Sequence, residues 1–295
     1  GPASRQISYL GWTMIILGSV IFLIVVAYLL YALFRRREGP AAVSGMRVVV
    51  WGGIIIPALI LIGLFVFNIN VLGAVNPSLI QTTMTVEVIG HQWWWEVRYP
   101  DHGFVTANEV RIPAGQPVRL ELTSEDVIHS FWVPELHGKM DLNPGSVNDF
   151  WIQADEPGEF VGECAEFCGT QHAKMLFRVV SESQQDFDNW VAQMQQPADA
   201  PGVGDAAAGM EIFLSANCVQ CHAVQGTEAA GEIGPDLTHI ASRRTIGAGI
   251  LPNTPENLLG WIANPHAIKP GVFMPASDLS AEELNDLVAY LLTLE

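Results

Sequence analysis

Twelve residues from Cys164 to Met175 bring together side chains that bind soft metals. The segment reads C-A-E-F-C-G-T-Q-H-A-K-M and supplies two thiols, an imidazole, a thioether and a carboxylate. Thiolate, imidazole and thioether suit copper, whereas hard cations prefer oxygen ligands. A single blue copper needs only one cysteine, so the close pair Cys164 and Cys168 predicts two coppers that share both sulfurs. His172, Met175 and a histidine from elsewhere in the chain would complete the ligands.

The alternative interpretation of this pair is a disulfide, which an oxidising compartment would favour. A bridge between Cys164 and Cys168 would leave His172 and Met175 unexplained. The missing histidine has a candidate in His129, which ends the polar turn S-E-D-V-I-H and precedes an apolar strand. We therefore expect His129 to reach the cysteine segment.

A second cluster of reactive residues lies further along the chain. Cys218-Val-Gln-Cys221-His222 matches C-x-x-C-H, the attachment signature of c-type heme, and a redox-active cysteine pair is the alternative. The cysteines would form thioether bonds, and His222 would be one axial ligand of the iron. Met274, in K-P-G-V-F-M-P, is the predicted second axial ligand, because Met210 lies on the helix expected before the signature. Such a pair of axial ligands raises the heme potential.

Two apolar runs precede both clusters. Residues 10–34 and 48–72 contain no charged side chain, and each exceeds the ~20 residues that cross a bilayer. Neither a buried core helix nor a signal peptide accounts for two such runs side by side. We expect a transmembrane hairpin within residues 1–75. Its connecting loop, 35–47, is rich in arginine and should face the cytoplasm, which places the rest of the chain outside it.

Charge is distributed unevenly along the 295 residues. Residues 1–75 hold 5 basic and 1 acidic side chains, residues 76–200 hold 6 and 19, and residues 201–295 hold 3 and 11, for a net charge of −17. A basic membrane segment thus carries two acidic water-facing parts. This distribution argues against a nucleic-acid partner and favours a basic soluble protein.

Short runs of alternating or β-branched residues follow the hairpin and are separated by turn signals. Their spacing predicts a β-sandwich or barrel, within a domain of residues 76–196. The cysteine segment should lie between its last two strands. The expected strands are 84–90, 94–99, 117–123, 147–152 and 174–180.

A short amphipathic helix at 183–195 should close this domain. A linker of small residues and prolines follows at 197–208, and as a flexible coil it spans roughly 20 Å. It leads into a final domain, 209–295, whose position relative to the metal cluster the linker leaves open. Ser280 and Glu283 form the capping-box pattern at the start of its last helix.

Three segments resemble cytochrome c oxidase subunit II: G-H-Q-W-W-W-E at 90–96, S-E-D-V-I-H-S-F at 124–131 and C-x-E-x-C-x-x-x-H-x-x-M at 164–175. The likeness extends over roughly residues 10–195. It implies a cupredoxin-like β domain that binds the dinuclear copper centre CuA. The implied copper ligands are His129, Cys164, Cys168, His172, Met175 and the backbone carbonyl of Glu166.

The same resemblance assigns two further roles. The side chain of Glu166 would reach a magnesium ion shared with the catalytic subunit. Trp93, the first tryptophan after G-H-Q, would mark the point where electrons enter CuA.

The last domain resembles a small class I cytochrome c, which implies an all-α fold. In that family a proline carbonyl accepts a hydrogen bond from the heme-ligating histidine, and the corresponding residue is Pro235. A subunit II followed by a cytochrome c domain resembles the corresponding subunit of the caa-type, proton-translocating heme–copper oxidases of prokaryotic cell membranes. The chain would take electrons from a soluble or membrane-bound donor at heme c. It would pass them through CuA to catalytic subunit I, which, with other membrane subunits, reduces dioxygen to water.

Other functions remain open. The chain could be the electron-input subunit of a CuA-containing nitric oxide reductase, or a copper-binding or assembly protein. A quinol-oxidase subunit is disfavoured, since it would lack the cysteines. Many relatives in the resembled family place a carboxylate near the cytoplasmic start of the second span. Here that region reads Arg47-Val48-Val49-Val50, and Glu38 is the only acid nearby, which argues against proton entry through this subunit.

Overall fold

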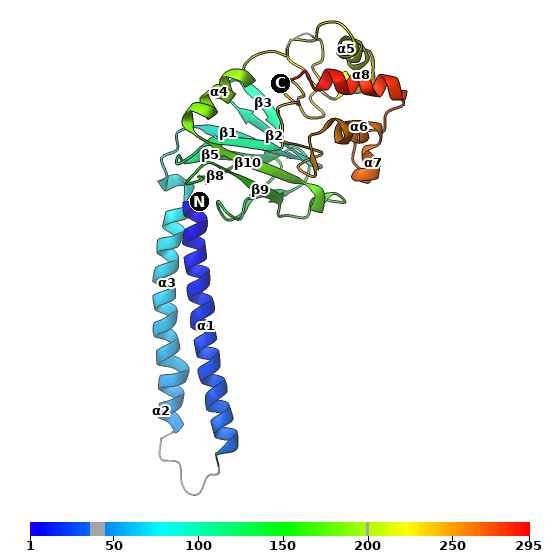
Figure 1. The fold of residues 1–295 in the computed structure, drawn as a ribbon. Helices are drawn as coiled ribbons and strands as arrows, with labels where there is room; N and C mark the ends of the chain where they lie inside the picture. Colours follow the sequence, from blue (N-terminus) through cyan, green and yellow to red (C-terminus); the bar gives the residue numbers. More distant parts are fainter. Residues whose placement is uncertain (36–44, 199–200) are drawn as a thin grey trace. The chain divides into compact units, whose positions relative to one another are not determined.

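The computed structural model describes residues 1–35, 45–198 and 201–295 (Figure 1). It divides into two compact units, one of residues 3–80 and one of residues 81–295 together with the first two residues. Most of the arginine-rich loop and part of the linker lie outside the described residues, namely 36–44 and 199–200.

The smaller unit consists of two long apolar helices. The first is α1 (Pro2–Phe34), and the second runs through Gly45–Val75. Both are long and apolar enough to cross a membrane, at 33 and 31 residues. Each extends beyond the apolar run that predicted it, because polar and small residues continue the helix at its ends.

The second of these helices is not regular throughout. It begins as α2 (Gly45–Val50), passes through a π-helical turn at Trp51–Ile55 and continues as α3 (Ile56–Val75). Pro57 follows the π turn and has no N–H with which to continue the α-helical pattern. The N–H of Ile56 bonds the carbonyl of Trp51, five residues back, as a π turn requires.

Residues 81–196, which we call the β domain, form two five-stranded sheets. In the first sheet the order is β3 (Phe104–Ala107), β2 (Trp94–Tyr99), β1 (Thr85–His91), β5 (Val118–Ser124) and β8 (Asn148–Ile152). In the second it is β4 (Glu109–Pro113), β10 (Leu176–Glu182), β9 (Gly158–Cys164), β6 (His129–Trp132) and β7 (Met140–Leu142). The pairs β1–β5 and β4–β10 are parallel, and the others are antiparallel. The predicted β-sandwich is confirmed.

Five of these strands match the expected ones within two residues at either end. The structure adds β3, β4, β6, β7 and β9. Four of the five are only three to five residues long, too short for a clear alternating pattern. The fifth, β9, contains Gly162, whose missing side chain makes room for Phe177: a Cβ there would lie 2.1 Å from that ring.

Aromatic side chains fill the interior of the sandwich. Trp95 is fully buried, and its ring meets the edges of Phe131 and Phe177 at centroid distances of 6.2 and 5.0 Å. Helix α4 (Gln184–Met194), capped by Ser183, lies where the amphipathic helix was expected and adds Trp190, which packs edge-on against Tyr99 at 5.2 Å. This packing fixes the strands from which the cysteine loop projects.

Residues 205–295, the helical domain, hold four α-helices: α5 (Asp205–Ser215), α6 (Pro255–Ala263), α7 (Pro265–Ile268) and α8 (Ala281–Leu291). Helix α5 begins at Asp205, ahead of residue 209, where the final domain was expected to begin. Gly209 lets α5 cross α8 closely, since a Cβ there would lie 1.9 Å from the carbonyl oxygen of Asp286. The predicted capping box of α8 is present.

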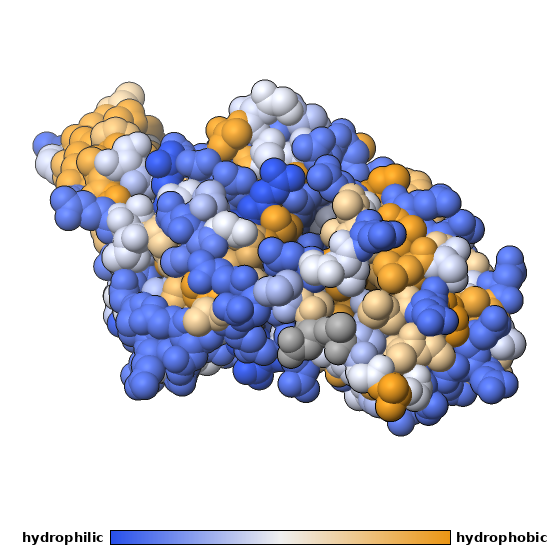
Figure 2. Space-filling view, turned by 90° about the horizontal axis from the view of Figure 1, so that it is seen from above, coloured by the Kyte–Doolittle hydropathy of each residue, from blue (hydrophilic) through white to orange (hydrophobic). Residues whose placement is uncertain are grey.

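On the face shown in Figure 2, hydrophilic side chains predominate between hydrophobic patches.

Candidate metal centre

The cysteine segment joins β9 to β10, as predicted. Cys164 is the last residue of β9, and Met175 directly precedes β10. His129 opens β6, the strand that pairs with the end of β9 through Phe131 and Cys164. Strand pairing therefore brings His129 to the cysteine loop, although 35 residues separate it from Cys164.

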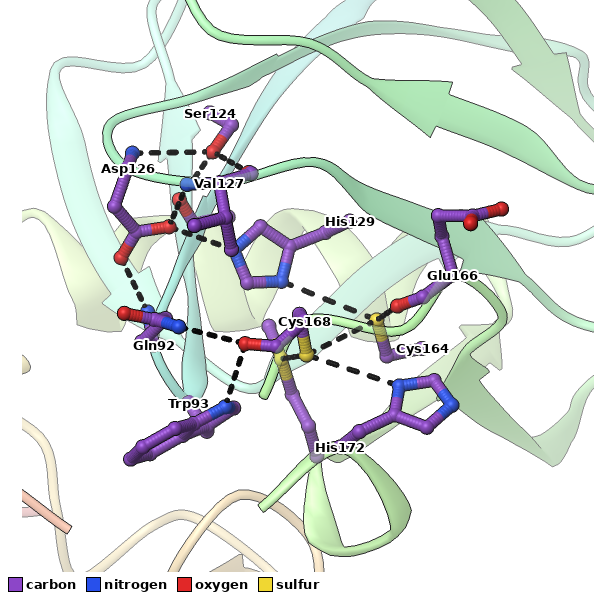
Figure 3. Close-up of polar contacts among 12 residues, drawn as sticks. Gln92, Trp93, Ser124, Asp126, Val127, His129, Cys164, Glu166, Cys168 and His172 are labelled. Carbon is purple, nitrogen blue, oxygen red and sulfur yellow. Dashed lines mark hydrogen bonds and ion pairs between the residues drawn. The ribbon is translucent and has the colours of Figure 1, made fainter. Parts of the chain in front are cut away.

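Soft donor atoms from this loop and from His129 converge at one place (Figure 3). The sulfurs of Cys164 and Cys168 are 3.7 Å apart, well beyond the ~2.05 Å of a disulfide. His129 Nδ1 lies 3.9 Å from Cys164 Sγ, and His172 Nδ1 lies 3.7 Å from Cys168 Sγ. Met175 Sδ is 3.7 Å from Cys168 Sγ. The structure thus brings together all five side chains that the sequence predicts as copper ligands.

The donor set fits copper by its chemistry. The side chains of His129 and Met175 are fully buried, and both cysteines are buried. Buried thiolates with imidazole and thioether donors suit a soft metal ion rather than magnesium or calcium.

Glu166 presents its two oxygen-bearing groups to different surroundings. Its backbone carbonyl oxygen lies 3.2 Å from Cys164 Sγ and faces the cluster. Its carboxylate points away from the cluster (Figure 3). It is 45% exposed and pairs with Lys139 Nζ at 3.2 Å. The two predicted contributions of Glu166 therefore point in different directions.

The pKa values of Cys164 and Cys168 are shifted in opposite directions. The two sulfurs lie within hydrogen-bonding distance, and the hydrogen bond between them lowers the pKa of Cys164 to about 3. The same bond, together with burial, raises the pKa of Cys168. Cysteine binds metal ions as the thiolate, so metal binding would displace the protons that this pair holds.

Asp126 orients His129, a role that was not predicted from the sequence. Its Oδ1 lies 2.8 Å from His129 Nε2, so the opposite nitrogen, Nδ1, faces the sulfurs. Burial alone would lower the pKa of His129, but the hydrogen bonds to Cys164 and Asp126 outweigh burial and raise it. The sequence signal was an acid three residues before the histidine.

Trp93 lies directly against the cysteine loop. Its side chain is buried, and its Nε1–H donates to the carbonyl oxygen of Cys168 at 3.0 Å. Gln92 donates to the same oxygen through Nε2 at 2.6 Å. The other two tryptophans of the run have different surroundings, since Trp94 stacks on His91 at 4.3 Å and Trp95 fills the core.

The second cluster lies in the helical domain, around a 3-10 turn at Asn217–Gln220. The N–H of His222 donates to the carbonyl of Cys218 at 2.9 Å, which holds the histidine beside the cysteines. His222 Nδ1 lies 2.7 Å from the carbonyl oxygen of Pro235, the partner that the resemblance implied. Burial lowers the pKa of His222, which favours the neutral imidazole that binds metal ions.

The surroundings of these residues fit a heme. Cys218 and Met274 are partly buried and pack against one apolar cluster of the helical domain. Gly234 leaves room for the imidazole, because a Cβ there would lie 2.7 Å from His222 Cε1. The role of Met274 as the second axial ligand stays a prediction.

Two family descriptions match the chain. Residues 104–182 match "Cytochrome C oxidase subunit II, periplasmic domain", and residues 206–295 match "Cytochrome c". Among solved structures, the periplasmic domain of subunit II of cytochrome oxidase (CoxB) of Bradyrhizobium japonicum is 30% identical, with a TM-score of 0.39. The similarity covers 39% of this chain and 96% of that one.

Curated relatives extend the match to the whole chain. Cytochrome c oxidase subunit 2 of Alkalihalophilus pseudofirmus is 38% identical over 309 aligned residues, which cover 100% of this chain and 89% of the relative. The protein of the same name from Bacillus sp. (strain PS3) is 35% identical over 89% of this chain and 80% of the relative. The chain therefore belongs to the cytochrome c oxidase subunit II family, as a subunit of an oxidoreductase, and carries a cytochrome c domain after its periplasmic domain.

Proposed function

We propose that the chain is the electron-input subunit of a terminal respiratory oxidase. It passes single electrons from heme c to a dinuclear CuA centre and on to catalytic subunit I, which reduces dioxygen to water. The observation that carries this proposal is the convergence of two cysteine sulfurs, 3.7 Å apart, with two imidazoles and a thioether. The names of the relatives support the oxidase context.

The proposed ligands are those expected from the sequence motifs and the resemblance. CuA would be held by His129, Cys164, Cys168, His172, Met175 and the Glu166 carbonyl. Heme c would be bound through Cys218 and Cys221, with His222 and Met274 as axial ligands. Bound heme and CuA each exchange one electron at a time, and the buried, hydrogen-bonded donors keep rearrangement small when charge moves.

Two residues of the β domain have further proposed roles, one at the entry of electrons and one at the contact with the partner subunit. Trp93 is the proposed point where electrons enter CuA, since its indole bonds the Cys168 carbonyl. The exposed carboxylate of Glu166 would exchange Lys139 for a magnesium ion shared with subunit I.

In the same proposal the helical hairpin anchors the chain in a prokaryotic cell membrane, with both folded domains on the extracytoplasmic side. A basic soluble protein, or a membrane-bound one, would donate the electrons.

Electron paramagnetic resonance of the oxidised complex tests the copper assignment. We expect a mixed-valence signal with hyperfine coupling to two coppers, and loss of that signal in the Cys168→Ser variant. A mononuclear signal from the unaltered protein would contradict the assignment. Pyridine hemochrome spectra should show one covalent heme, which the Cys221→Ala variant retains through a single thioether bond.

Two alternative functions make different predictions for the intact complex. A nitric oxide reductase would turn over nitric oxide rather than dioxygen in steady state. A copper-binding or assembly protein would show no electron transfer between its heme and its copper.

A further inference from the structure

The segment of residues 268–273, which leads directly to Met274, lies against the cysteine loop of the other domain. Lys174 Nζ donates to the carbonyl oxygen of Ile268 at 2.5 Å. Gln171 Nε2, from a buried side chain, donates to the carbonyl oxygen of Pro270, also at 2.5 Å. The two donors flank His172, a predicted copper ligand. The chain before the predicted heme ligand therefore contacts the loop that carries the predicted copper ligands.

Within this segment Lys269 forms a buried connection between the domains. Its side chain is 1% exposed, and Nζ donates to the carbonyl oxygens of Trp93, at 3.0 Å, and Gly247, at 3.1 Å. A lysine is rarely buried unless its amine finds partners. Ala248, which follows Gly247, accepts a hydrogen bond from the N–H of Leu176 at 3.0 Å. A second loop of the helical domain therefore meets the end of the cysteine loop.

Phe273 stacks on Trp93. The ring centroids are 5.5 Å apart and the planes are inclined by 21°, which is an offset-stacked arrangement. Phe273 remains 69% exposed, so the burial of its ring contributes little to core packing. Phe273 is covalently joined to Met274, and Trp93 is hydrogen-bonded to Cys168. The contact between Phe273 and Trp93 therefore links the predicted heme ligand Met274 to the predicted copper ligand Cys168.

We infer that Phe273 is the residue through which electrons cross from the helical domain to Trp93, and that Lys269 is the positioning residue that holds the two rings in contact. This inference rests on the proposed function. Each crossing moves one electron, so that ferrous heme becomes ferric and the copper pair gains one reducing equivalent. No bond forms or breaks, and no proton is transferred. Aromatic rings in contact favour this step because electron tunnelling weakens steeply with each gap between atoms.

The inference is tested in the intact complex by photochemical injection of one electron at heme c. Oxidation of the heme and reduction of the copper are then followed by their separate absorption bands. Phe273→Leu should slow the internal transfer by about tenfold to a hundredfold, the scale that small misplacements of reacting groups produce. Phe273→Trp keeps an aromatic ring at this position, so its rate of internal electron transfer should match that of the unaltered protein. Heme spectrum and midpoint potential should stay as in the unaltered protein, which shows that Met274 is undisturbed.

Lys269→Met should slow the transfer and also increase hydrogen–deuterium exchange in residues 268–273, whereas Phe273→Leu should leave that exchange unchanged. The matched control is Arg244→Gln, which removes an exposed ion pair with Glu159, at 3.0 Å, between the same two domains. An exposed pair contributes little, so its rate and exchange should match those of the unaltered protein.

The outcomes separate the inference from the function on which it rests. If the unaltered complex transfers electrons from heme to copper and Phe273→Leu does so equally fast, the role of Phe273 is wrong. Unchanged rate and exchange in Lys269→Met would likewise refute the positioning role. If the unaltered complex shows no such transfer, the proposed function fails, and the inference fails with it.

Discussion

Glu109 Oε1 accepts the backbone N–H of Arg244 at 2.6 Å and so ties strand β4 to the helical domain. The same oxygen accepts the N–H of Thr245 at 3.2 Å. Burial raises the pKa of Glu109, although the two N–H bonds and nearby arginines oppose that effect. A buried carboxylate therefore helps to fix the arrangement of two domains that the sequence joins only through a linker.

Replacing Glu109 separates the hydrogen bonds from the charge. Glu109→Ala leaves two N–H groups without an acceptor, which should cost about 1–3 kcal/mol for each group that stays buried. Glu109→Gln keeps an acceptor oxygen and removes the buried charge, so its cost should be clearly smaller. Denaturant unfolding of the full chain in detergent, followed by tryptophan fluorescence, measures the difference. Equal destabilisation by both variants would contradict the role of the N–H bonds.

Gly90 limits the space beside the predicted copper ligand His129. A Cβ at residue 90 would lie 2.7 Å from His129 Cδ2, closer than non-bonded atoms approach. Gly90→Ala should therefore push the imidazole from its place beside Cys164 and reduce both copper content and the dinuclear signal. Metal analysis and electron paramagnetic resonance measure these effects.

Gly158→Ala is the control for this prediction. Its Cβ would lie 3.5 Å from Phe160, an ordinary contact, and we expect full copper content. A Gly90→Ala protein that binds copper as well as this control would show that His129 has room to move.

Gly234 has the corresponding place beside His222. An added Cβ would lie 2.7 Å from Cε1 of a ring that the Pro235 carbonyl holds at 2.7 Å. We expect Gly234→Ala to lower the yield of covalent heme or to shift the heme spectrum, as measured by pyridine hemochrome and visible absorption.

Gly260 provides the comparison, since it lies within helix α6 with open space around it. Gly260→Ala should keep the heme and gain up to about 1 kcal/mol of stability from helix propensity. Normal heme content and spectrum in Gly234→Ala would refute the steric argument.

Lys269 should make the stability of the chain depend on pH. Burial lowers its pKa to about 7, the positive charge of Lys174 adds to this, and Cys168 opposes it. Above about pH 7 the folded chain has lost a proton that the unfolded chain keeps until about pH 10, so the free energy of unfolding rises with pH across this window.

The Lys269→Met variant lacks this proton and isolates the effect. The stability of the unaltered chain relative to Lys269→Met should increase between about pH 6 and about pH 9, as measured by denaturant unfolding at each pH. A constant or decreasing difference would show that the amine stays charged in the folded chain.

Much of the candidate site was predictable from sequence because its residues are close together along the chain. Cys164, Cys168, His172 and Met175 occupy one loop, and their spacing alone indicates a shared metal. His129 was predicted from its place before a strand, and the pairing of β6 with β9 brings it to the cysteines. Asp126 was missed, because a carboxylate three residues before a histidine is common on any polar turn.

Features that depend on local order were predictable from the order of residues alone: two long apolar helices, alternating strands, the cysteine spacing and the C-x-x-C-H signature. Their physical basis is the periodicity of the backbone and the reach of neighbouring side chains. The contacts between residues that are distant along the chain became known from the three-dimensional fold. Lys269 and Trp93 are 176 residues apart, and Glu109 and Arg244 are 135 apart. Contacts of this kind follow from how the two domains pack, and a linker of small residues carries no information about that packing.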